Sequence, residues 1–233
     1  MALGSYLTKT PAIIPSLVGW FDASDLSTIT SGGGTASAIR NMANSLNSFS
    51  QPTATNQPAT GVNNINGRNV LTFDGVDNYM TSASAFMNPT TSGGTVLMVV
   101  QPQTTATLQI YLNQAGTNVA AYLRNQAGAI PQSAIGGVNS SSTTFSNGSN
   151  YIFGVRFPTS GTLDILVNSI TTSFSSITVG TSTSIFYLGS TSAPSNYSSI
   201  YFGELLIYSR NLSNDELLTA QRYLGNKWGI SAP

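Results

Sequence analysis

The sequence predicts an all-β protein: a two-sheet antiparallel jelly-roll sandwich with one short C-terminal helix. Three observations support this fold class. Short apolar or alternating segments are separated by turn residues at intervals of about 8–15 residues, as in sandwiches and jelly rolls. Residues 200–210 are apolar on both faces, which is typical of a strand inside a layered structure. Residues 213–228 then carry the pattern of a single amphipathic helix.

The N-terminal half contains several candidate strands, of which residues 95–101 (TVLMVVQ) are apolar on both faces and predict a central strand. Residues 74–77 (DGVD) predict a turn, and residues 79–80 the start of the return strand. Residues 31–35 (SGGGT) indicate a flexible loop, and residues 48–67 a long surface loop rich in Pro, Thr, Asn and Gln. The other strands expected here are residues 17–21, 39–43 and 69–73.

The second half alternates more regularly. Residues 151–157 and 163–167 each place apolar side chains at every second position, and a partner strand containing Phe174 and Ile177 predicts a hairpin that turns near Asn168. Residues 125–150 are rich in Gly, Ser and Asn and indicate a second long loop with at most one strand. The remaining strands are expected at residues 108–112, 120–124 and 185–189.

The last strand and helix carry the clearest local signals. Strict alternation places Ile200, Phe202, Leu206 and Tyr208 on the same face as Glu204, with Tyr201, Leu205 and Ile207 on the other. Ser213 and Glu216 have the spacing of a capping box, and Gly225 and Gly229 punctuate the end of the helix. Leu217, Ala220, Leu224 and Trp228 recur at helical spacing, which predicts that this face packs against the sheet.

Composition restricts the chemistry that the chain can perform. Charged residues make up 7% of the 233 residues, against about 25% in an average domain, and the net charge is zero. Without His or Cys, Ser-His and Cys-His nucleophile systems are excluded and zinc sites lack their usual ligands. We also expect stability to change little between pH 5 and 8. Scattered Lys and Arg residues argue against nucleic acid as a partner.

The chain is predicted to be one jelly-roll domain, residues 17–233, preceded by an extended N-terminal arm, residues 1–16. Pro11 and Pro15 favour extended backbone in the arm. No signal-peptide pattern is present at the N-terminus, and the longest apolar run, residues 96–100, is too short to insert into a membrane. We therefore expect synthesis in the cytoplasm.

Three stretches resemble the concanavalin A-like lectin/glucanase superfamily, in its laminin-G/pentraxin-like jelly-roll form. They are LVGWFDASD near the start, NVLTFDGVDNYM in the middle, and GELLIYSRNLSNDELLTAQRYLGNKWGI at the end. The resemblance implies two antiparallel sheets and a short helix after the last strands. It implies no particular activity, since the fold hosts lectins, glycosidases, adhesion modules and phage structural proteins.

No catalytic, cofactor or metal site is predicted. The chain has two Glu: Glu216 is explained by capping, and Glu204 is expected to bind Arg210, Lys227 or backbone amides at the helix corner. Some relatives in this fold bind calcium, but the acids that could hold it are expected to close turns. Carbohydrate binding would use exposed aromatic side chains, whereas Trp20 and Trp228 are expected in the core. The calcium candidates are Asp22, Asp25, Asp74 and Asp77, and the stacking candidates are Tyr6, Tyr111, Tyr122, Tyr187 and Tyr197.

These features together favour a non-enzymatic virion structural protein, a phage surface module such as a capsid decoration, head fibre or tail protein. It would be located in the virion and contact other virion proteins and copies of itself, through the arm and residues 27–37, 48–66 and 125–150. The alternative is a lectin-like module that recognises host glycans, and a glycoside hydrolase or lyase is a third reading. A neutral surface of hydroxyl and amide groups, which tolerates dense packing of many copies, favours the first.

Overall fold

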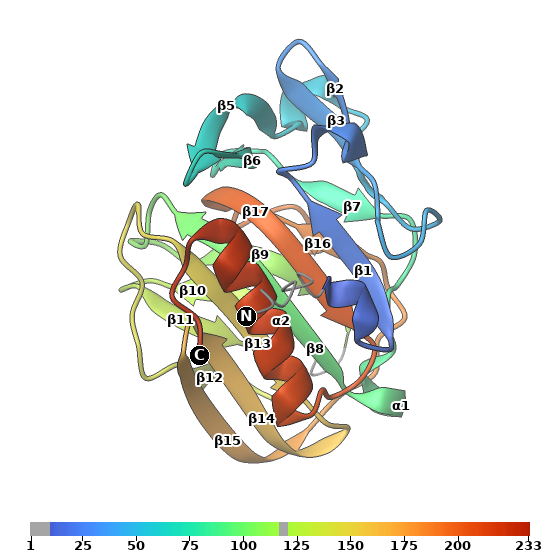
Figure 1. Cartoon of the computed structure of the whole chain (residues 1–233), viewed down its shortest axis with the longest axis vertical. Helices are drawn as coiled ribbons and strands as arrows, with labels where there is room; N and C mark the ends of the chain where they lie inside the picture. The colour runs from blue at the N-terminus through green and yellow to red at the C-terminus, as the bar shows by residue number, and fades with distance from the viewer. Residues whose placement is uncertain (1–9, 117–120) are drawn as a thin grey trace, which may run out of the picture.

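The computed structural model describes residues 10–116 and 121–233 and has the all-β fold that the sequence predicts (Figure 1). Every strand pairing among these residues is antiparallel, and the strands form two sheets, here called the front and back sheets. The helix α2 (Asn214–Trp228) lies across the front sheet. The predicted sandwich of jelly-roll type with one short C-terminal helix is confirmed. The shorter helical segments are η1 (Pro11–Ile13), η2 (Leu26–Thr28), η3 (Ala54–Asn56) and α1 (Pro89–Ser92).

The front sheet is built around two strands that are buried on both faces. β17 pairs along its length with β8, and β8 pairs on its other side with β13, followed by β14 and β15. One half of β17 also pairs with β1 and the other half with β6, which pairs with β5. The strands are β1 (Leu17–Asp22), β5 (Ala59–Ile65), β6 (Arg68–Asp74), β8 (Gly94–Pro102), β13 (Tyr151–Phe157), β14 (Ser160–Val167), β15 (Ile170–Thr178) and β17 (Ser199–Tyr208).

The back sheet has the order β2-β3-β4-β7-β16-β9-β10-β11-β12. A single pairing between β3 and β5 links it to the front sheet at one edge. Its strands are β2 (Ile29–Gly32), β3 (Thr35–Ile39), β4 (Phe49–Ser50), β7 (Met80–Ser82), β9 (Gln109–Gln114), β10 (Ala121–Gln126), β11 (Ile130–Ser133), β12 (Asn139–Ser140) and β16 (Phe186–Leu188).

Two hydrophobic cores separate three layers. The first lies between the sheets and is rich in aromatic rings, including Phe21, Phe49 and Phe186. The second lies between the front sheet and α2. Val96, Met98 and Val100 of β8 face the first core while Leu97 and Val99 face the second, which confirms the predicted central strand. The predicted hairpin at Asn168 is also confirmed by the β14–β15 pairing. The second core includes Leu97, Val99, Ile152, Leu166, Leu206, Tyr208, Leu217, Ala220, Leu224 and Trp228.

The predicted faces of β17 are wrong because the strand contains a bulge. The register against β8 shifts between Phe202 and Glu204, so Gly203 is an extra residue that reverses the alternation. Ile200 and Phe202 therefore face the sandwich core together with Leu205 and Ile207, whereas Leu206 and Tyr208 face α2. A Cβ on Gly203 would lie 2.8 Å from Val99 Cγ1 and 3.0 Å from the Trp228 ring, so the close packing of α2 requires glycine here.

The predicted long loops contain regular structure. Residues 48–67 hold β4, η3 and all of β5, and residues 125–150 hold β11 and β12 in addition to the end of β10. The glycines of residues 31–35 make a tight turn between β2 and β3, with positive φ angles at Gly33 and Gly34. Strand β3 lies earlier than the predicted residues 39–43, and β7 pairs with β4 and β16 rather than returning along β6. These pairings involve distant segments, which local patterns do not specify.

The division into an arm and a domain remains a prediction. Residues 1–9 and residue 120, the first of the predicted strand 120–124, lie outside the described residues. Within residues 10–16, Pro11 and Ile14 are buried, and the Tyr208 hydroxyl donates a hydrogen bond to the Pro11 carbonyl. The C-terminal part of the predicted arm thus packs with the second core. Among the described segments, neither α-helix is long and apolar enough to cross a membrane.

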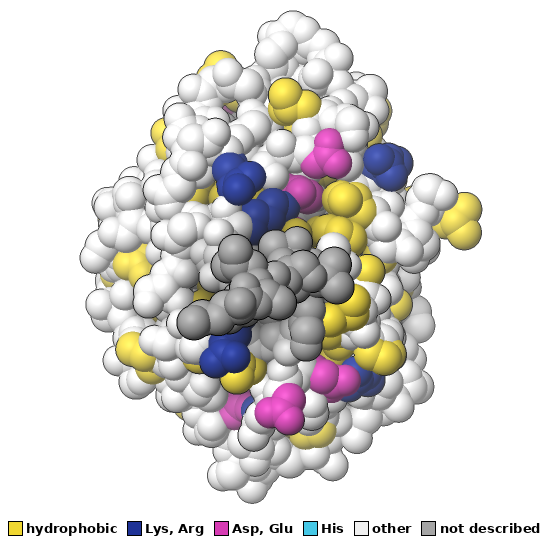
Figure 2. Space-filling model, in the orientation of Figure 1, with side chains coloured by type: hydrophobic (Ala, Val, Ile, Leu, Met, Phe, Trp, Pro, Cys, Tyr) yellow, Lys and Arg dark blue, Asp and Glu magenta, His cyan; other side chains and the backbone are white. Residues whose placement is uncertain are grey.

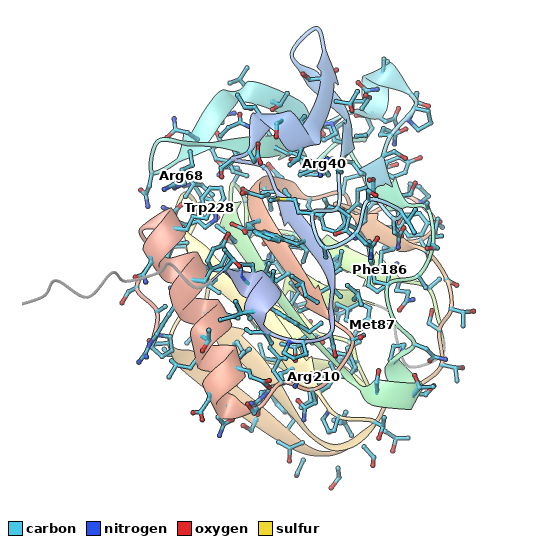
Figure 3. The ribbon with its side chains drawn as sticks, turned by 45° about the vertical axis from the view of Figure 1, so that its right-hand side comes forward. Arg40, Arg68, Met87, Phe186, Arg210 and Trp228 are labelled. Carbon is cyan, nitrogen blue, oxygen red and sulfur yellow. The ribbon has the colours of Figure 1, made fainter. Side chains whose placement is uncertain are left out.

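Both ends of α2 are capped as the sequence predicts. The Ser213 hydroxyl accepts a hydrogen bond from the Glu216 amide, and the Glu216 carboxylate accepts one from the Ser213 amide. Gly229 ends the helix in the left-handed conformation, and the Asn66 side chain donates to the Trp228 carbonyl at 2.7 Å. Figure 3 shows Trp228 at this end of the helix and Arg210 near the other. Ser213, Glu216 and Gly229 therefore fix where α2 begins and ends.

Glu216 provides a pH test of the helix start. Hydrogen bonds from Arg210 and Ser213 lower its pKa to about 2. Because the carboxyl of an unfolded chain titrates near pH 4.3, Glu216 stabilises the fold above that pH and loses its contribution as the pH falls toward 2. Glu216→Gln should therefore flatten the fall in unfolding free energy over this window by about 0.5–1 kcal/mol, as expected for a solvent-exposed pair. Urea unfolding at several pH values measures this.

Asp215→Asn is the matched control, because Asp215 lies in the same helical turn and its side chain has no hydrogen bond or ion pair within the described part of the chain. The control should keep the pH slope of the original protein. Equal slopes for Glu216→Gln and the original protein would contradict the assigned role of the Arg210–Glu216 pair.

Candidate functional site: a polar groove beside the C-terminal helix

The sequence singles out Glu204, and the structure places it in a buried cluster beneath α2. Its side chain is fully buried, and its carboxylate accepts four hydrogen bonds. The donors are Trp20 Nε1 at 2.7 Å, Tyr223 Oη at 2.8 Å, Lys227 Nζ at 2.6 Å and Trp228 Nε1 at 2.7 Å. The predicted partner Lys227 is therefore correct, whereas Arg210 binds Glu216 instead.

The backbone positions of this cluster explain its electrostatics. Asp22 on β1 is the direct cross-strand neighbour of Glu204 on β17, so two carboxylates lie side by side. Lys227 Nζ binds both of them, which offsets the repulsion. Burial raises the pKa of Glu204 and the charge of Asp22 raises it further, while Lys227 and the Trp228 donor act in the opposite direction.

This cluster is suited to holding structure rather than to acid–base chemistry. Glu204 has no exposed surface, and Asp22 is 5% exposed, so neither carboxylate can reach a substrate. Asp22 Oδ1 also accepts hydrogen bonds from the amide and hydroxyl of Ser24. A glycosidase needs two acids that flank a bound glycosidic bond, and here Lys227 occupies the space between them.

Asp25 and Asp74 close turns, as expected. Asp25 accepts hydrogen bonds from the amide and hydroxyl of Ser27 at the start of η2, and these lower its pKa. Asp74 accepts from the Val76 amide at 2.9 Å. Asp77 contributes its backbone instead: its amide donates to Asp74 Oδ1 at 3.4 Å, and its carbonyl accepts from the Asn56 side chain. In the residues that the structure describes, no group of three or more His, Cys, Asp or Glu side chains is placed to hold a metal ion.

The aromatic candidates for sugar stacking are mostly internal. Tyr111 and Tyr122 are fully buried in the sandwich core, so the interpretation of these two as stacking platforms is wrong. Tyr187 and Tyr197 are half-buried, and Tyr6 lies outside the described residues. The aromatic pattern alone does not distinguish core tyrosines from surface ones. Trp228 is fully buried as predicted, and Trp20 is half-buried with its indole N–H bound to Glu204.

A groove of about 620 Å³ lies between α2 and the outer face of β14 and β15. Its position follows from the layers: α2 packs over β8 and β13, and β14 and β15 extend beyond it at the edge of the front sheet, as Figure 1 shows. Most of its lining side chains carry hydroxyl or amide groups. The lining residues are Arg156, Thr162, Asp164, Thr171, Ser173, Asn211, Asn214, Leu217, Leu218 and Gln221.

A cross-strand row fixes the polar centre of this groove. Arg156, Asp164 and Ser173 are direct neighbours on β13, β14 and β15. Arg156 Nε donates to Asp164 Oδ2 at 3.0 Å, and the Ser173 hydroxyl donates to Asp164 Oδ1 at 2.6 Å. Arg156 Nη1 also donates to the Leu212 carbonyl and to Asn214 Oδ1, at 3.1 Å and 2.7 Å. The Arg156–Asp164 ion pair is thus held rigidly and joins the sheet to the start of α2.

The groove combines a neutral charge balance with uncommitted polar groups. Arg156 and Asp164 cancel each other's charge, and their side chains are 15% and 9% exposed. Thr162, Thr171 and Asn211 line the groove with no hydrogen bond assigned to their side chains in the described chain. Such a site can offer several hydrogen bonds to a ligand without presenting a net charge.

The sequence analysis did not identify this groove. The available signal was one charged residue in each of two apolar strands, Arg156 in YIFGVRF and Asp164 in GTLDILV. An isolated charge on an apolar strand indicates a partner on an adjacent strand. The helix wall, more than forty residues away along the chain, could not be assigned without the tertiary arrangement.

Comparison with known proteins identifies the fold but no family. No protein family matches the sequence, and no curated protein matches it. Among solved structures, the Trypanosoma rangeli sialidase in complex with sialic acid has a TM-score of 0.65 and 14% sequence identity, covering 92% of this chain and 33% of that one. The chain therefore spans about a third of the sialidase.

Two further solved structures share the arrangement. Domain 4 of AbnA, a GH43 extracellular arabinanase from Geobacillus stearothermophilus, in complex with arabinotriose, has a TM-score of 0.57 and 13% identity, covering 88% of this chain and 98% of that domain. The receptor-binding domain of botulinum neurotoxin D has a TM-score of 0.61 and 9% identity, covering 91% and 53%. At these identities the likeness establishes a shared β-rich fold. Membership of the concanavalin A-like superfamily remains a prediction.

Replacing Glu204 tests whether its cluster holds α2 in place. Glu204→Gln removes the charge that Lys227 and both indole N–H groups bind, while keeping the side-chain size. We expect a loss of about 3–5 kcal/mol in unfolding free energy, the range for breaking a buried ion pair by removing one partner. Urea unfolding monitored by tryptophan fluorescence measures the loss.

Asp74→Asn is the control, because this exposed turn carboxylate can be replaced by an amide that still accepts the Val76 hydrogen bond. It should cost less than about 0.5 kcal/mol. The double variant Glu204→Gln/Lys227→Met should lose less than the sum of the single losses. A loss of unfolding free energy below about 1 kcal/mol for Glu204→Gln would show that this cluster does not hold α2 in place.

Proposed function

We propose that this chain is a non-catalytic, carbohydrate-binding β-sandwich domain. The observation that carries the proposal is the groove beside α2, a neutral site lined by hydroxyl and amide groups. Sugars are recognised through many directional hydrogen bonds from such groups. Solved structures with the same fold add support, because one of them is a domain in complex with arabinotriose that aligns over 98% of its length.

The arrangement of acids supports a binding role rather than hydrolysis. The two most buried carboxylates beneath α2, Asp22 and Glu204, are tied to Lys227, and Asp164 in the groove is tied to Arg156 and Ser173. Each of these acids has its charge paired and its position fixed. A hydrolase of the two-carboxylate type requires one acid to act as a proton donor and the other to act at the sugar carbon.

A glycan array probed with the full chain tests the proposal. We expect binding to a subset of neutral glycans and no release of reducing sugar when those glycans are incubated with the protein. Heat-unfolded protein at the same concentration is the control for non-specific adhesion. A complete absence of hits, or hydrolysis of a bound glycan, would contradict a non-catalytic carbohydrate-binding role.

A virion surface role is the second candidate, and the uncharged surface favours it. With 7% charged residues, the chain presents few charged side chains, and on the face that carries α2 these lie in small groups of both signs among mostly uncharged atoms, as Figure 2 shows. Weak electrostatic self-repulsion permits dense packing of many copies. Both roles are compatible, since a sugar-binding domain can stand on a particle surface.

Removing residues 1–9 tests the contact proposed for the N-terminal arm, while Ile14 keeps its packing in the second core and Pro11 its hydrogen bond from Tyr208. The truncated chain should fold with an unchanged melting temperature but be lost from purified particles, as measured by quantitative mass spectrometry. Equal incorporation of truncated and full-length chains would refute the arm contact. Absence of the full-length chain from particles would refute the virion role.

A further inference from the structure

We propose that the groove beside α2 binds a short neutral oligosaccharide and that the Arg156–Asp164 pair makes it select against acidic sugars. This inference rests on the proposed carbohydrate-binding function and assigns it a site and a ligand class. It is independent of the sugars found in the similar structures, one of which holds sialic acid.

The first step concerns the cation. An arginine that recognises an acidic sugar must have donors free to bind the ligand's carboxylate. Here Arg156 Nε and Nη2 both donate to Asp164, and Nη1 donates to Leu212 and Asn214. Four of the five guanidinium N–H groups are therefore taken, so an incoming carboxylate could bind through two N–H groups only by displacing Asp164, Leu212 or Asn214. A neutral hydroxyl needs no such displacement.

The second step concerns the groups that remain available. Thr162 and Thr171 present hydroxyls from adjacent strands, and Asn211 presents an amide from the corner before α2. Gln221 donates its amide to the Asn168 carbonyl, which leaves its carbonyl oxygen as an acceptor. Hydroxyl and amide groups can each donate and accept, which matches the mixed hydrogen bonding of sugar hydroxyls.

The third step concerns shape and the apolar part of the wall. Leu217 and Leu218 line the α2 side of the groove, opposite the polar face of β14 and β15. A sugar ring has hydroxyls around its edge and C–H groups on its faces, so it can place its edge on the strands and a face on the leucines. A volume of about 620 Å³ lies within the usual range for ligand sites and admits roughly two or three sugar rings.

Thr171→Trp tests the location of the site by filling the groove from an exposed strand position. The probes are arabinotriose and the strongest neutral hit of the array, titrated into the full chain by isothermal calorimetry. We expect at least a tenfold loss of affinity, equivalent to about 1.4 kcal/mol. Thr178→Trp is the matched control, because Thr178 is exposed on the same strand and does not line the groove.

The two proposals fail in different ways. If the chain binds array glycans and Thr171→Trp binds them as well as the original protein does, the groove assignment is overturned while the carbohydrate-binding function stands. If neither probe nor any array glycan binds, the function itself is overturned. Melting temperatures of both tryptophan variants confirm that any loss of binding occurs in folded protein.

Selectivity is tested with sialic acid as the acidic probe. The original protein should bind the neutral probes at least tenfold more tightly than sialic acid, and equal or tighter binding of sialic acid would overturn the selectivity. Asp164→Asn should free the guanidinium of Arg156 and improve sialic acid binding at least tenfold, so that the preference for neutral probes over sialic acid narrows by the same factor. Asp215→Asn removes the same charge outside the groove and should leave both affinities unchanged. If Asp164→Asn does not fold, the comparison of probes on the original protein still decides the question.

Discussion

The hydrogen-bonded burial of the Glu204 carboxylate is the interaction on which the rest of this structure depends. A carboxylate buried without partners would cost many kcal/mol, so β17 can carry one only because four donors converge on it. Three of those donors come from α2 and one from β1, which means that the carboxylate is satisfied only when helix and strand are both docked. Lys227 adds the charge balance by binding Asp22 as well. The requirement to satisfy Glu204 therefore specifies one position for the helix, in addition to the non-directional apolar packing around Trp228.

A bulge of one residue makes this interaction possible. With regular alternation, Glu204 would share a face with Ile200 and Phe202 and would enter the aromatic core between the two sheets. Gly203 shifts the register, so that Glu204 turns toward α2 while the apolar residues on either side of it remain in the sandwich core. The same glycine leaves room for the Trp228 ring. One position thus determines both the orientation of the buried charge and the distance between helix and sheet.

The sequence was sufficient for features that neighbouring residues determine and insufficient for those that depend on distant ones. Residues close together in the sequence determine the capping box at Ser213 and Glu216 and the strand β8, which is buried on both faces. Both features were predicted correctly. The β17 bulge was missed because this strand has apolar residues on both faces, so its sequence pattern does not show where the register shifts. The groove was missed because Arg156 and Asp164 form part of a binding site only when β13 and β14 lie side by side and α2 packs beside them. Among the candidate tyrosines, Tyr111 and Tyr122 prove to be core residues, which composition alone could not reveal.

The position of α2 links the stabilising cluster to the proposed binding site. Because Glu204 and Trp228 anchor the helix over the centre of the front sheet, the helix covers β8 and β13 and leaves β14 and β15 open. Arg156 then joins the exposed strands to the start of the helix, through Asp164 on one side and Leu212 and Asn214 on the other. The groove lies between a sheet and a helix that is held at both ends, so it is pre-organised. Ligand binding therefore costs little free energy for ordering the site. The groove is also neutral because of this pair, since the charge of Asp164 cancels the charge of Arg156, the residue that joins the sheet to the start of α2. A rigid and uncharged groove is suited to neutral sugars. These hydroxyl-rich ligands bind weakly, because they have few apolar atoms and no charge, and they gain too little binding energy to order a flexible site.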